Sequence, residues 1–430
     1  MQPVVHHVEM CVRDGRHTLA SLKHYGFRLH AQRVTPFCKQ WVIKLGEVFF
    51  IITERQKNYV KHSIWNENTV RAEPWTVLCC ESQSAHEVDT VFNVSFCVKN
   101  VKNVTGRVRS LGASVIQPPT SVKDEKNGHV SYSIVRSCCG NVVHTLINKD
   151  DYTGSFLPGF ETVDTIIEDS SETTGVTHID HVTLACSPGH SSSIISWYES
   201  CFGMQRFSIS RNDDNDEGLI LADGVGLRLK AMEYWMCSEI GLMYPVSSKH
   251  RQRNSNGVML VVVESLPGQT NCNVETYLRE HEGPGVEHVA LNTPKIVETV
   301  SKMISLGVKF RQPPAAYYNE LKKVREIQEI GEDLTELEKL GILLDNEVEP
   351  GKIKEKDGSP KYLMQIFAHP LFSRKTFFIE VIERSGARGL GSGNIIALVR
   401  SVREEEKRKM AEAKQKTMNE EDISSPRRLC

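Results

Sequence analysis

The stretch "GPGVEHVALNTPKIVETVSKMISLGVKF", residues 283–310, reads as a strand, a helix and a glycine turn. Side chains alternate faces along a strand, so His288 is expected to share one face with Val286 and Ala290, opposite Glu287. A Thr-Pro pair then marks a helix start, because proline fits the first helical turn. The predicted helix carries an apolar stripe and ends at a glycine: Thr293, Ile296, Val297, Val300, Ile304 and Gly307.

The same unit occurs four times in the chain. Its other copies begin "VVHHVEMCV" (4–12), "VFNVSFCVKNV" (91–101) and "HIDHVTLACSPG" (178–189). Superposing the strands aligns four positions: His7, Asn93, His181 and His288. The helix-ending glycine follows 19 residues later in three units and 22 residues later in the third. This internal repeat predicts four βαβββ modules.

Each module is expected to close with a further strand. These strands are "EVFFIITER" (47–55), "NVVHTLINK" (141–149), "GLRLKAMEY" (226–234) and "KTFFIEVIER" (375–384). In the last of them, Phe378, Glu380 and Ile382 share a face. A carboxylate on a strand that is apolar on both faces is costly unless a cation or strong donors meet it. Glu380 therefore needs a partner.

Pairing the modules predicts an α+β fold of two open β-barrel domains with a C-terminal lid helix. The predicted domains are 1–160, a 161–177 linker, and 178–402, followed by a charged tail at 403–430. The first half offers His7 and Asn93, with Thr145 where Glu380 would stand. We therefore interpret it as a half without a carboxylate and without a metal.

The second half alone has two aligned histidines and the buried glutamate. A single histidine on a half-buried strand is usually structural, so the repeat is what favours a ligand role. Two neutral imidazoles and one carboxylate match the facial arrangement of non-haem Fe(II) oxygenases. Three protein ligands leave three octahedral positions open, enough for a bidentate substrate and O2. Zinc competes on ligand type, but it prefers four-coordinate sites and has no redox chemistry.

Composition narrows the other classes of function. The 430-residue chain has a net charge of -2 and a pI near 6.8, which gives no basic surface for nucleic acid. No stretch approaches the roughly 18 apolar residues that a transmembrane helix needs. The 12 cysteines include no C-x-x-C pair, which favours free thiols in a reducing compartment.

The glycine-rich "GLGSGN", residues 389–394, suggests a nucleotide-binding turn. Its spacing is G-x-G-x-G rather than G-x-G-x-x-G, and no βαβ crossover with an acidic residue about 20 positions on follows it. A turn into the C-terminal lid helix is the favoured interpretation.

The chain resembles the vicinal oxygen chelate superfamily and, within it, the 4-hydroxyphenylpyruvate dioxygenase family, over residues 1 to about 405. The resemblance lies in "FLPGF" (156–160), "IDHVTLACSPG", "GPGVEHVALNTPKIVE", "GILLD", "YLMQIFAHPLF" and "FFIEVIERSGARGLGSGNI". It implies Fe(II) held by His181 rather than His178, by His288 and by Glu380. It also implies a 2-oxo acid substrate, 4-hydroxyphenylpyruvate, that is oxidatively decarboxylated by O2 and hydroxylated.

The resemblance further implies a set of substrate-pocket residues. Gln365, Phe367, Phe378 and Asn394 match the family pattern. Leu390 and Ile395 stand where tyrosine-degrading members have phenylalanines, and Val263, Asn273 and Glu287 replace an asparagine and two glutamines. Attack on the ring would give homogentisate, and attack on the benzylic carbon would give 4-hydroxymandelate. These departures favour 4-hydroxymandelate, with homogentisate formation and a non-catalytic metal-binding sensor as alternatives.

The phrases "VESLPG", "TPKIVE" and "PPAAYY" are most similar to the animal dioxygenase-like branch of the family. That branch is associated with mitochondria and with the coenzyme Q head group. The resemblance therefore implies a mitochondrial location, which the basic N-terminus up to Lys44 also favours. A cytoplasmic location is the alternative. Open barrels can pair through several faces, so a homodimer is also open.

Overall fold

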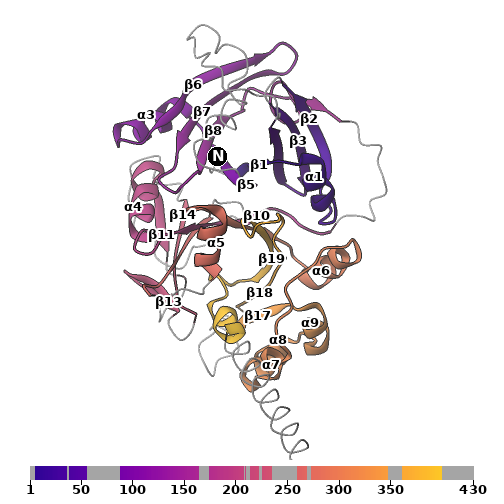
Figure 1. Ribbon diagram of the computed structural model, residues 1–430. Helices are drawn as coiled ribbons and strands as arrows, with labels where there is room; N and C mark the ends of the chain where they lie inside the picture. The colour runs from indigo at the N-terminus through magenta and orange to yellow at the C-terminus, as the bar shows by residue number, and fades with distance from the viewer. Residues whose placement is uncertain are drawn as a thin grey trace, which may run out of the picture.

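The computed structural model describes residues 5–35, 38–55, 88–163, 174–207, 209, 214–221, 225–234, 259–268, 273–346 and 361–399. The predicted tail at 403–430 lies outside these residues. Two mixed sheets with helices on their outer faces confirm the predicted α+β class (Figure 1).

The N-terminal half contains two repeats of strand, helix and three strands. Its elements are β1 (Val5–Val12), α1 (Gly15–Lys23), β2 (Arg28–Val34), β3 (Cys38–Leu45), β4 (Val48–Arg55), β5 (Thr90–Cys97), α3 (Val101–Ser110), β6 (Val115–Asp124), β7 (Gly128–Arg136), β8 (Val143–Asn148) and β9 (Glu161–Thr162). The sheet order is β6-β7-β8-β5-β1-β4-β3-β2-β9. Because β9 pairs with β2, the predicted linker at 161–177 begins inside the first sheet.

The C-terminal half repeats this plan with insertions. Its elements are β10 (Ile179–Cys186), α4 (Ser191–Phe202), β11 (Met204–Phe207), β12 (Asp214–Asn215), β13 (Gly218–Leu221), β14 (Leu227–Tyr234), β15 (Met259–Ser265), α5 (Asn273–His281), β16 (Gly285–Asn292), α6 (Ile296–Ser305), α7 (Ala315–Asn319), α8 (Leu321–Ile330), α9 (Leu334–Leu340), β17 (Leu343–Asn346), β18 (Tyr362–Phe367) and β19 (Phe378–Ser385). The sheet order is β12-β13-β14-β15-β10-β16-β19-β18-β17, with β11 beside β14.

The closing strand of the third module was predicted wrongly. The segment 226–234 forms β14, but β15 is the strand that pairs parallel with β10, as β4 pairs with β1. Both segments have patterns typical of strands, an alternating one in 226–234 and an apolar run in 259–263, so periodicity could not show which of them closes the module. Pairing direction decides the assignment.

Helix α6 begins later than predicted. Its N-cap is Lys295, and the Thr293 hydroxyl accepts a hydrogen bond from the Lys295 N–H. The buried stripe consists of Ile296, Thr299, Val300 and Met303, whereas the predicted Ile304 is 39% exposed. Gly307 follows the helix with φ 105°, a left-handed conformation that glycine adopts without steric cost.

A carboxylate at the end of the closing strand fixes the module helix in three of the four modules. Glu54, Glu264 and Glu383 accept hydrogen bonds from the first backbone N–H of α1, α4 and α6, at 2.7, 3.0 and 2.7 Å. These N–H groups lack partners within the helix, and the helix dipole favours a negative charge there. The sheet and its helix are therefore joined at the same place in these three repeats.

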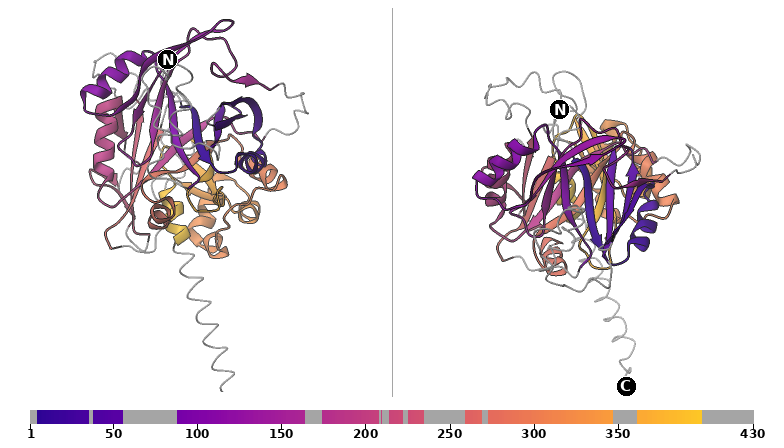
Figure 2. Two further views of the ribbon diagram at one scale, coloured as in Figure 1. Left: turned by 45° about the horizontal axis from the view of Figure 1, so that its top comes forward. Right: turned by 90° about the horizontal axis from the view of Figure 1, so that it is seen from above.

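The two halves share one large hydrophobic core. Helices α3 and α4 lie side by side on one flank in both orientations (Figures 1 and 2). Between the halves, the His281 ring nitrogen Nε2 lies 2.7 Å from the Thr90 hydroxyl. Among the described helices, none is long and apolar enough to cross a membrane.

Candidate metal centre

Two β-bulges position the functional side chains of the C-terminal half. Where β10 pairs with β16, the register shifts between Ile179 and His181 and again beside His288. Each shift inserts one extra residue, Asp180 in β10 and Glu287 in β16. A bulge breaks the alternation of faces and re-aims side chains. Each acid can therefore reach the histidine that follows it, and the predicted placement of Glu287 opposite His288 was wrong.

The bulge also changes the partners of His288. Val286, predicted on its face, belongs to the shared core on the outer side of the sheet. Ala290 remains on the inner face, where it pairs with Glu380 of β19. Strict alternation therefore placed only one of the two apolar neighbours correctly.

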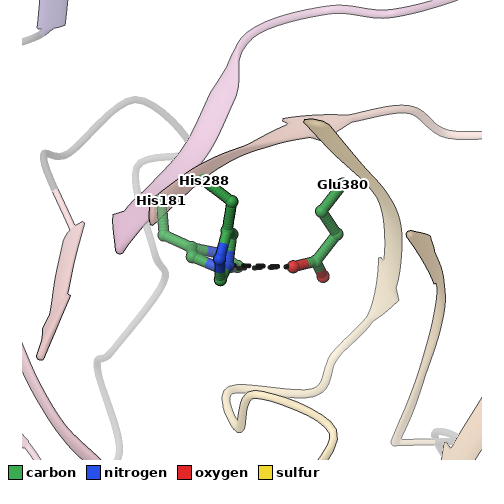
Figure 3. A group of neighbouring side chains, drawn as sticks. All are labelled: His181, His288 and Glu380. Atoms are coloured by element: carbon green, nitrogen blue, oxygen red, sulfur yellow. Dashed lines mark ion pairs between the residues drawn. The ribbon is translucent and has the colours of Figure 1, made fainter. Parts of the chain in front are cut away.

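The three predicted metal ligands converge on the inner face of the sheet (Figure 3). The Nε2 atoms of His181 and His288 lie 3.5 and 3.3 Å from Oε2 of Glu380. All three ligand atoms lie within 4.8 Å of one another, and no other such group occurs in the described parts of the chain. The side chains of His181 and Glu380 are 4% exposed and that of His288 is 12% exposed.

Each histidine is oriented by the acid that precedes it. His181 Nδ1 donates to Asp180 Oδ1 at 2.8 Å, and His288 Nδ1 donates to Glu287 Oε2 at 3.1 Å. These bonds leave both Nε2 lone pairs aimed at the centre of the group. Carboxylates in this position fix the tautomer of a metal-binding histidine and raise its basicity.

The electrostatics of the group are those of paired charges. Burial would raise the pKa of Glu380, but His181 and His288 lower it to about 2. Burial would likewise lower the pKa of His288, yet bonds to Glu287 and Glu380 raise it to about 9. Without a metal, the proton on the His288 imidazole thus supplies the positive charge that stabilises the Glu380 carboxylate.

The donor set fits a divalent metal. With bonds of about 2.1 Å, two ligand atoms at right angles on a metal lie about 3 Å apart, close to the spacings seen here. Two imidazole nitrogens and one carboxylate oxygen form a donor set that suits Fe(II) and would leave further positions for other ligands. The two histidines are the partners that were expected for the buried carboxylate of Glu380.

Two predicted aromatic residues line the group. The Phe378 ring stacks on His288 at 4.7 Å between centroids, and Phe367 meets Phe378 edge-on at 6.2 Å. Aromatic rings in these arrangements attract one another and present flat apolar surfaces. A substrate ring held beside the metal would contact these faces.

Predicted polar residues also face inward with unmet hydrogen-bonding capacity. Both amide atoms of Gln365 and the Asn394 Nδ2 are buried without a partner, while Asn394 Oδ1 accepts from the Tyr317 hydroxyl. A β-carbon at Gly391 would clash with the Gln365 amide, so the glycine-rich turn allows close approach. Buried polar atoms without partners are rare and costly, which points to a ligand that completes them.

Val263, Leu390 and Ile395 belong to one apolar cluster on the inner face of the C-terminal sheet. Residues 392–399 form the helix that carries Ile395, in the place predicted for the lid. Two other residues predicted for the pocket lie elsewhere in the C-terminal half. Asn273 is exposed at the start of α5, and Glu287 is bonded to the metal ligand His288, so their place in the pocket stays a prediction.

Three functional positions were missed from the sequence. Asp180 and Arg384 form a bidentate ion pair at 2.7 and 2.8 Å, and Arg384 also donates to the Gly389 carbonyl in the turn before the lid helix. The Thr183 hydroxyl, two residues after His181, is buried without a partner. The acid before each histidine, in "IDH" and "VEH", was the available signal.

The N-terminal half holds a polar cluster at the same place. His7, Asn93 and Thr145 take the positions of the three ligands, as predicted, but the cluster does contain a carboxylate, Glu9. Glu9 accepts hydrogen bonds from Gln40, Thr53 and Asn93 at 3.0, 2.7 and 3.0 Å. The description of this half as lacking a carboxylate was therefore wrong.

Comparison with known proteins identifies the class. No protein-family model matches the chain. A triple mutant of 4-hydroxymandelate synthase from Streptomyces coelicolor superposes with a TM-score of 0.64 over 94% of this chain and all of that chain, at 23% identity. This likeness shows the fold alone, which is the vicinal oxygen chelate fold.

Sequence relatives identify the family. The chain is 34% identical over 409 residues to the human 4-hydroxyphenylpyruvate dioxygenase-like protein, covering 94% of this chain and 96% of that protein. The rat dioxygenase-like protein is also 34% identical, over 89% of this chain and 91% of its own length. The 4-hydroxyphenylpyruvate dioxygenase of Neurospora crassa is 32% identical over 76% of this chain and 72% of its own. The chain belongs to the 4-hydroxyphenylpyruvate dioxygenase family.

Proposed function

We propose that the protein is an Fe(II)-dependent dioxygenase that converts 4-hydroxyphenylpyruvate to 4-hydroxymandelate. The observation that carries this proposal is the buried group of His181, His288 and Glu380 beside the stacked ring of Phe378. A non-catalytic sensor is disfavoured, because a sensor needs neither open metal positions nor orphaned pocket amides.

The residues of the chain have separate tasks in this proposal. His181, His288 and Glu380 would hold the metal, and Asp180 and Glu287 hold the imidazoles in the binding tautomer. When bound, iron supplies the activation of O2 and of the chelated 2-oxo acid. Phe367 and Phe378 hold the aromatic ring, while Gln365 and Asn394 offer hydrogen bonds to its polar end.

The choice of product follows from the shape of the pocket wall. Val263, Leu390 and Ile395 belong to one aliphatic cluster of the C-terminal half, which we take as the wall of the substrate site. An aliphatic wall does not clamp a ring between two flat faces, so the substrate can turn its benzylic carbon towards the metal. Hydroxylation at that carbon gives 4-hydroxymandelate.

The test is the product formed from 4-hydroxyphenylpyruvate by the iron-loaded protein under air. We expect stoichiometric O2 uptake, CO2 release and 4-hydroxymandelate. Homogentisate as the main product would replace this assignment with the tyrosine-degrading activity. Tight metal binding without any substrate-dependent O2 uptake would instead support the sensor.

We further propose that the protein acts in mitochondria and that its product supplies the coenzyme Q head group. The support is the resemblance to the animal dioxygenase-like branch together with the basic N-terminal segment. Cell fractionation with an antibody against the protein tests the location, and a cytoplasmic signal alone would refute it. Light scattering of the purified protein decides between monomer and homodimer.

A further inference from the structure

Arg311 lies on a segment outside the sheets, against the ring of Phe378. Its backbone N–H donates to the Phe367 carbonyl at 2.8 Å, which ties the segment to the end of β18. Its guanidinium lies 5.1 Å from the centroid of the Phe378 ring, and the same ring stacks on His288 at 4.7 Å. One aromatic side chain therefore contacts both the guanidinium and a metal ligand.

The guanidinium is half-buried and has no direct counter-ion. Within the described residues it makes no ion pair and no side-chain hydrogen bond, and Glu287 is the one carboxylate that acts on it electrostatically. Burial lowers the pKa of Arg311. Arginine stays charged in proteins, so five donors and a positive charge remain available beside Phe378.

The other half of the centre shows the contrast. Asp180, which orients His181, is fully paired with Arg384 through two hydrogen bonds. Glu287, which orients His288, has Arg311 near it but not bonded to it. Arg384 is thus held in a structural ion pair, whereas Arg311 is not.

Charge counting shows what the uncommitted arginine adds. The positive charges are a divalent cation and the guanidiniums of Arg311 and Arg384. The negative charges are the carboxylates of Glu380, Asp180 and Glu287. The site with its metal therefore has one net positive charge. Without Arg311 the site would be neutral. Beside buried side chains, one such charge favours an anion.

We propose that Arg311 is a substrate-binding residue that receives the carboxylate of an anionic 2-oxo acid beside the metal. This inference rests on the proposed function and deepens it. A chelating 2-oxo acid uses its keto oxygen and one carboxylate oxygen, so the second carboxylate oxygen stays free to accept from the guanidinium. The site thereby selects aromatic 2-oxo acids over neutral aromatic ketones.

Substrate binding without turnover tests the role. The Fe(II)-loaded protein under nitrogen is titrated by calorimetry with 4-hydroxyphenylpyruvate and with the neutral 4-hydroxyphenylacetone. We expect Arg311→Leu and Arg311→Gln to raise the Kd for the acid about tenfold or more, the size of a lost charge-assisted hydrogen bond. The Kd for the ketone should stay unchanged, and Arg311→Lys should recover most of the affinity for the acid.

Arg374→Leu is the matched control, because Arg374 forms an exposed ion pair with Glu282. This variant should bind both ligands as the unmodified protein does. Unchanged binding of the acid by Arg311→Leu would overturn the inference, and so would an equal loss for acid and ketone. A fall in Fe(II) affinity with unchanged substrate Kd would also overturn it, since Arg311 would then act only through Glu287.

The proposed function can fail separately. If 4-hydroxyphenylpyruvate does not bind the unmodified protein but phenylpyruvate binds in an Arg311-dependent way, the substrate assignment falls and the role of Arg311 stands. If 4-hydroxyphenylpyruvate binds and is converted equally well by Arg311→Leu, the proposed function stands and this inference falls.

Discussion

The two halves of the molecule use one backbone plan for opposite purposes. Strands β1, β5 and β8 pair in the register of β10, β16 and β19. The corresponding side chains are His7 and His181, Asn93 and His288, Thr145 and Glu380, and Glu9 and Thr183. Topology alone therefore does not make a metal centre.

The protonation of the two clusters runs in opposite directions. Burial lowers the pKa of His7 to about 3 and raises that of Glu9, so burial disfavours the charged form of each group. Mutual pairing raises the pKa of His288 and lowers that of Glu380, so both favour their charged forms. A cation is stabilised only in the second environment.

The bulges explain part of this difference. Both halves keep bulges before the aligned positions, but the N-terminal bulges insert His6 and Phe92 where the C-terminal ones insert Asp180 and Glu287. His6 meets His7 through their Nδ1 atoms at 2.8 Å. An imidazole cannot supply the negative charge that makes its neighbour a strong ligand. The supporting residues decide which half can bind metal.

The largest expected effect is the loss of turnover when a metal ligand is removed. His181→Ala, His288→Ala and Glu380→Ala should each lower turnover at least about a thousandfold, because each removes a ligand that the others cannot replace. His7→Ala, at the matching position of the other half, should leave turnover within about twofold. Steady-state O2 uptake measures both. A ligand variant with near-normal turnover would remove that residue from the metal.

The next prediction concerns which metal supports turnover and how many metal sites each chain has. Chelation should abolish turnover, and Fe(II) should restore it while Zn(II) does not, because zinc has no redox chemistry. Titration of the metal-free protein should find one tight site per chain. Two equally tight sites would show that the polar cluster around Glu9 also binds metal.

The supporting acids should matter less than the ligands. Asp180→Asn and Glu287→Gln are each expected to weaken metal binding about 10- to 100-fold. His6→Ala, at the equivalent bulge of the N-terminal half, is the control and should leave the affinity unchanged. Competition with a coloured chelator gives the dissociation constants. Equal affinities in all four proteins would show that the acids do not support the ligands.

The raised pKa of His288 predicts a pH dependence of metal binding. The metal needs the neutral imidazole, whereas the metal-free site keeps its proton up to about pH 9. Affinity should therefore rise with pH, about tenfold per unit below that value, with about one proton released at pH 7. Calorimetry in buffers of different ionisation enthalpy counts the proton. No release at pH 7 would contradict the paired charge state.

The repeat made most of the fold predictable. Aligned strands located His181 and His288, and the cost of a buried carboxylate located Glu380, because these signals depend on single residues at fixed spacing. The bulges were not predictable, since one extra residue leaves the apolar pattern of "GVEHVAL" unchanged while it moves Glu287 to the side of His288.

Contacts between residues far apart in the chain could not be predicted from the sequence for a different reason. Arg384 reaches Asp180 across 204 positions, and Glu9 meets Gln40 and Thr53 from neighbouring strands. Local periodicity says which residues face inward but not which of them meet. Charged residues on buried strands signalled that partners existed without identifying them.

The smallest expected effect concerns the product. Leu390 and Ile395 belong to the aliphatic cluster that we propose as one wall of the substrate site, where flat rings would clamp the substrate instead. Ile395→Phe with Leu390→Phe should therefore shift part of the flux from 4-hydroxymandelate to homogentisate, because the carbon held nearest the metal is the one hydroxylated. Overpacking of this cluster costs about 1–3 kcal/mol and lowers the total rate, so the measured quantity is the ratio of products by chromatography.

Leu219→Phe, in the same apolar cluster but on β13, is the control and should leave the ratio unchanged. A ratio that does not move in the double variant would show that the aliphatic wall does not select the carbon, and homogentisate as the main product of the unmodified protein would refute the assignment.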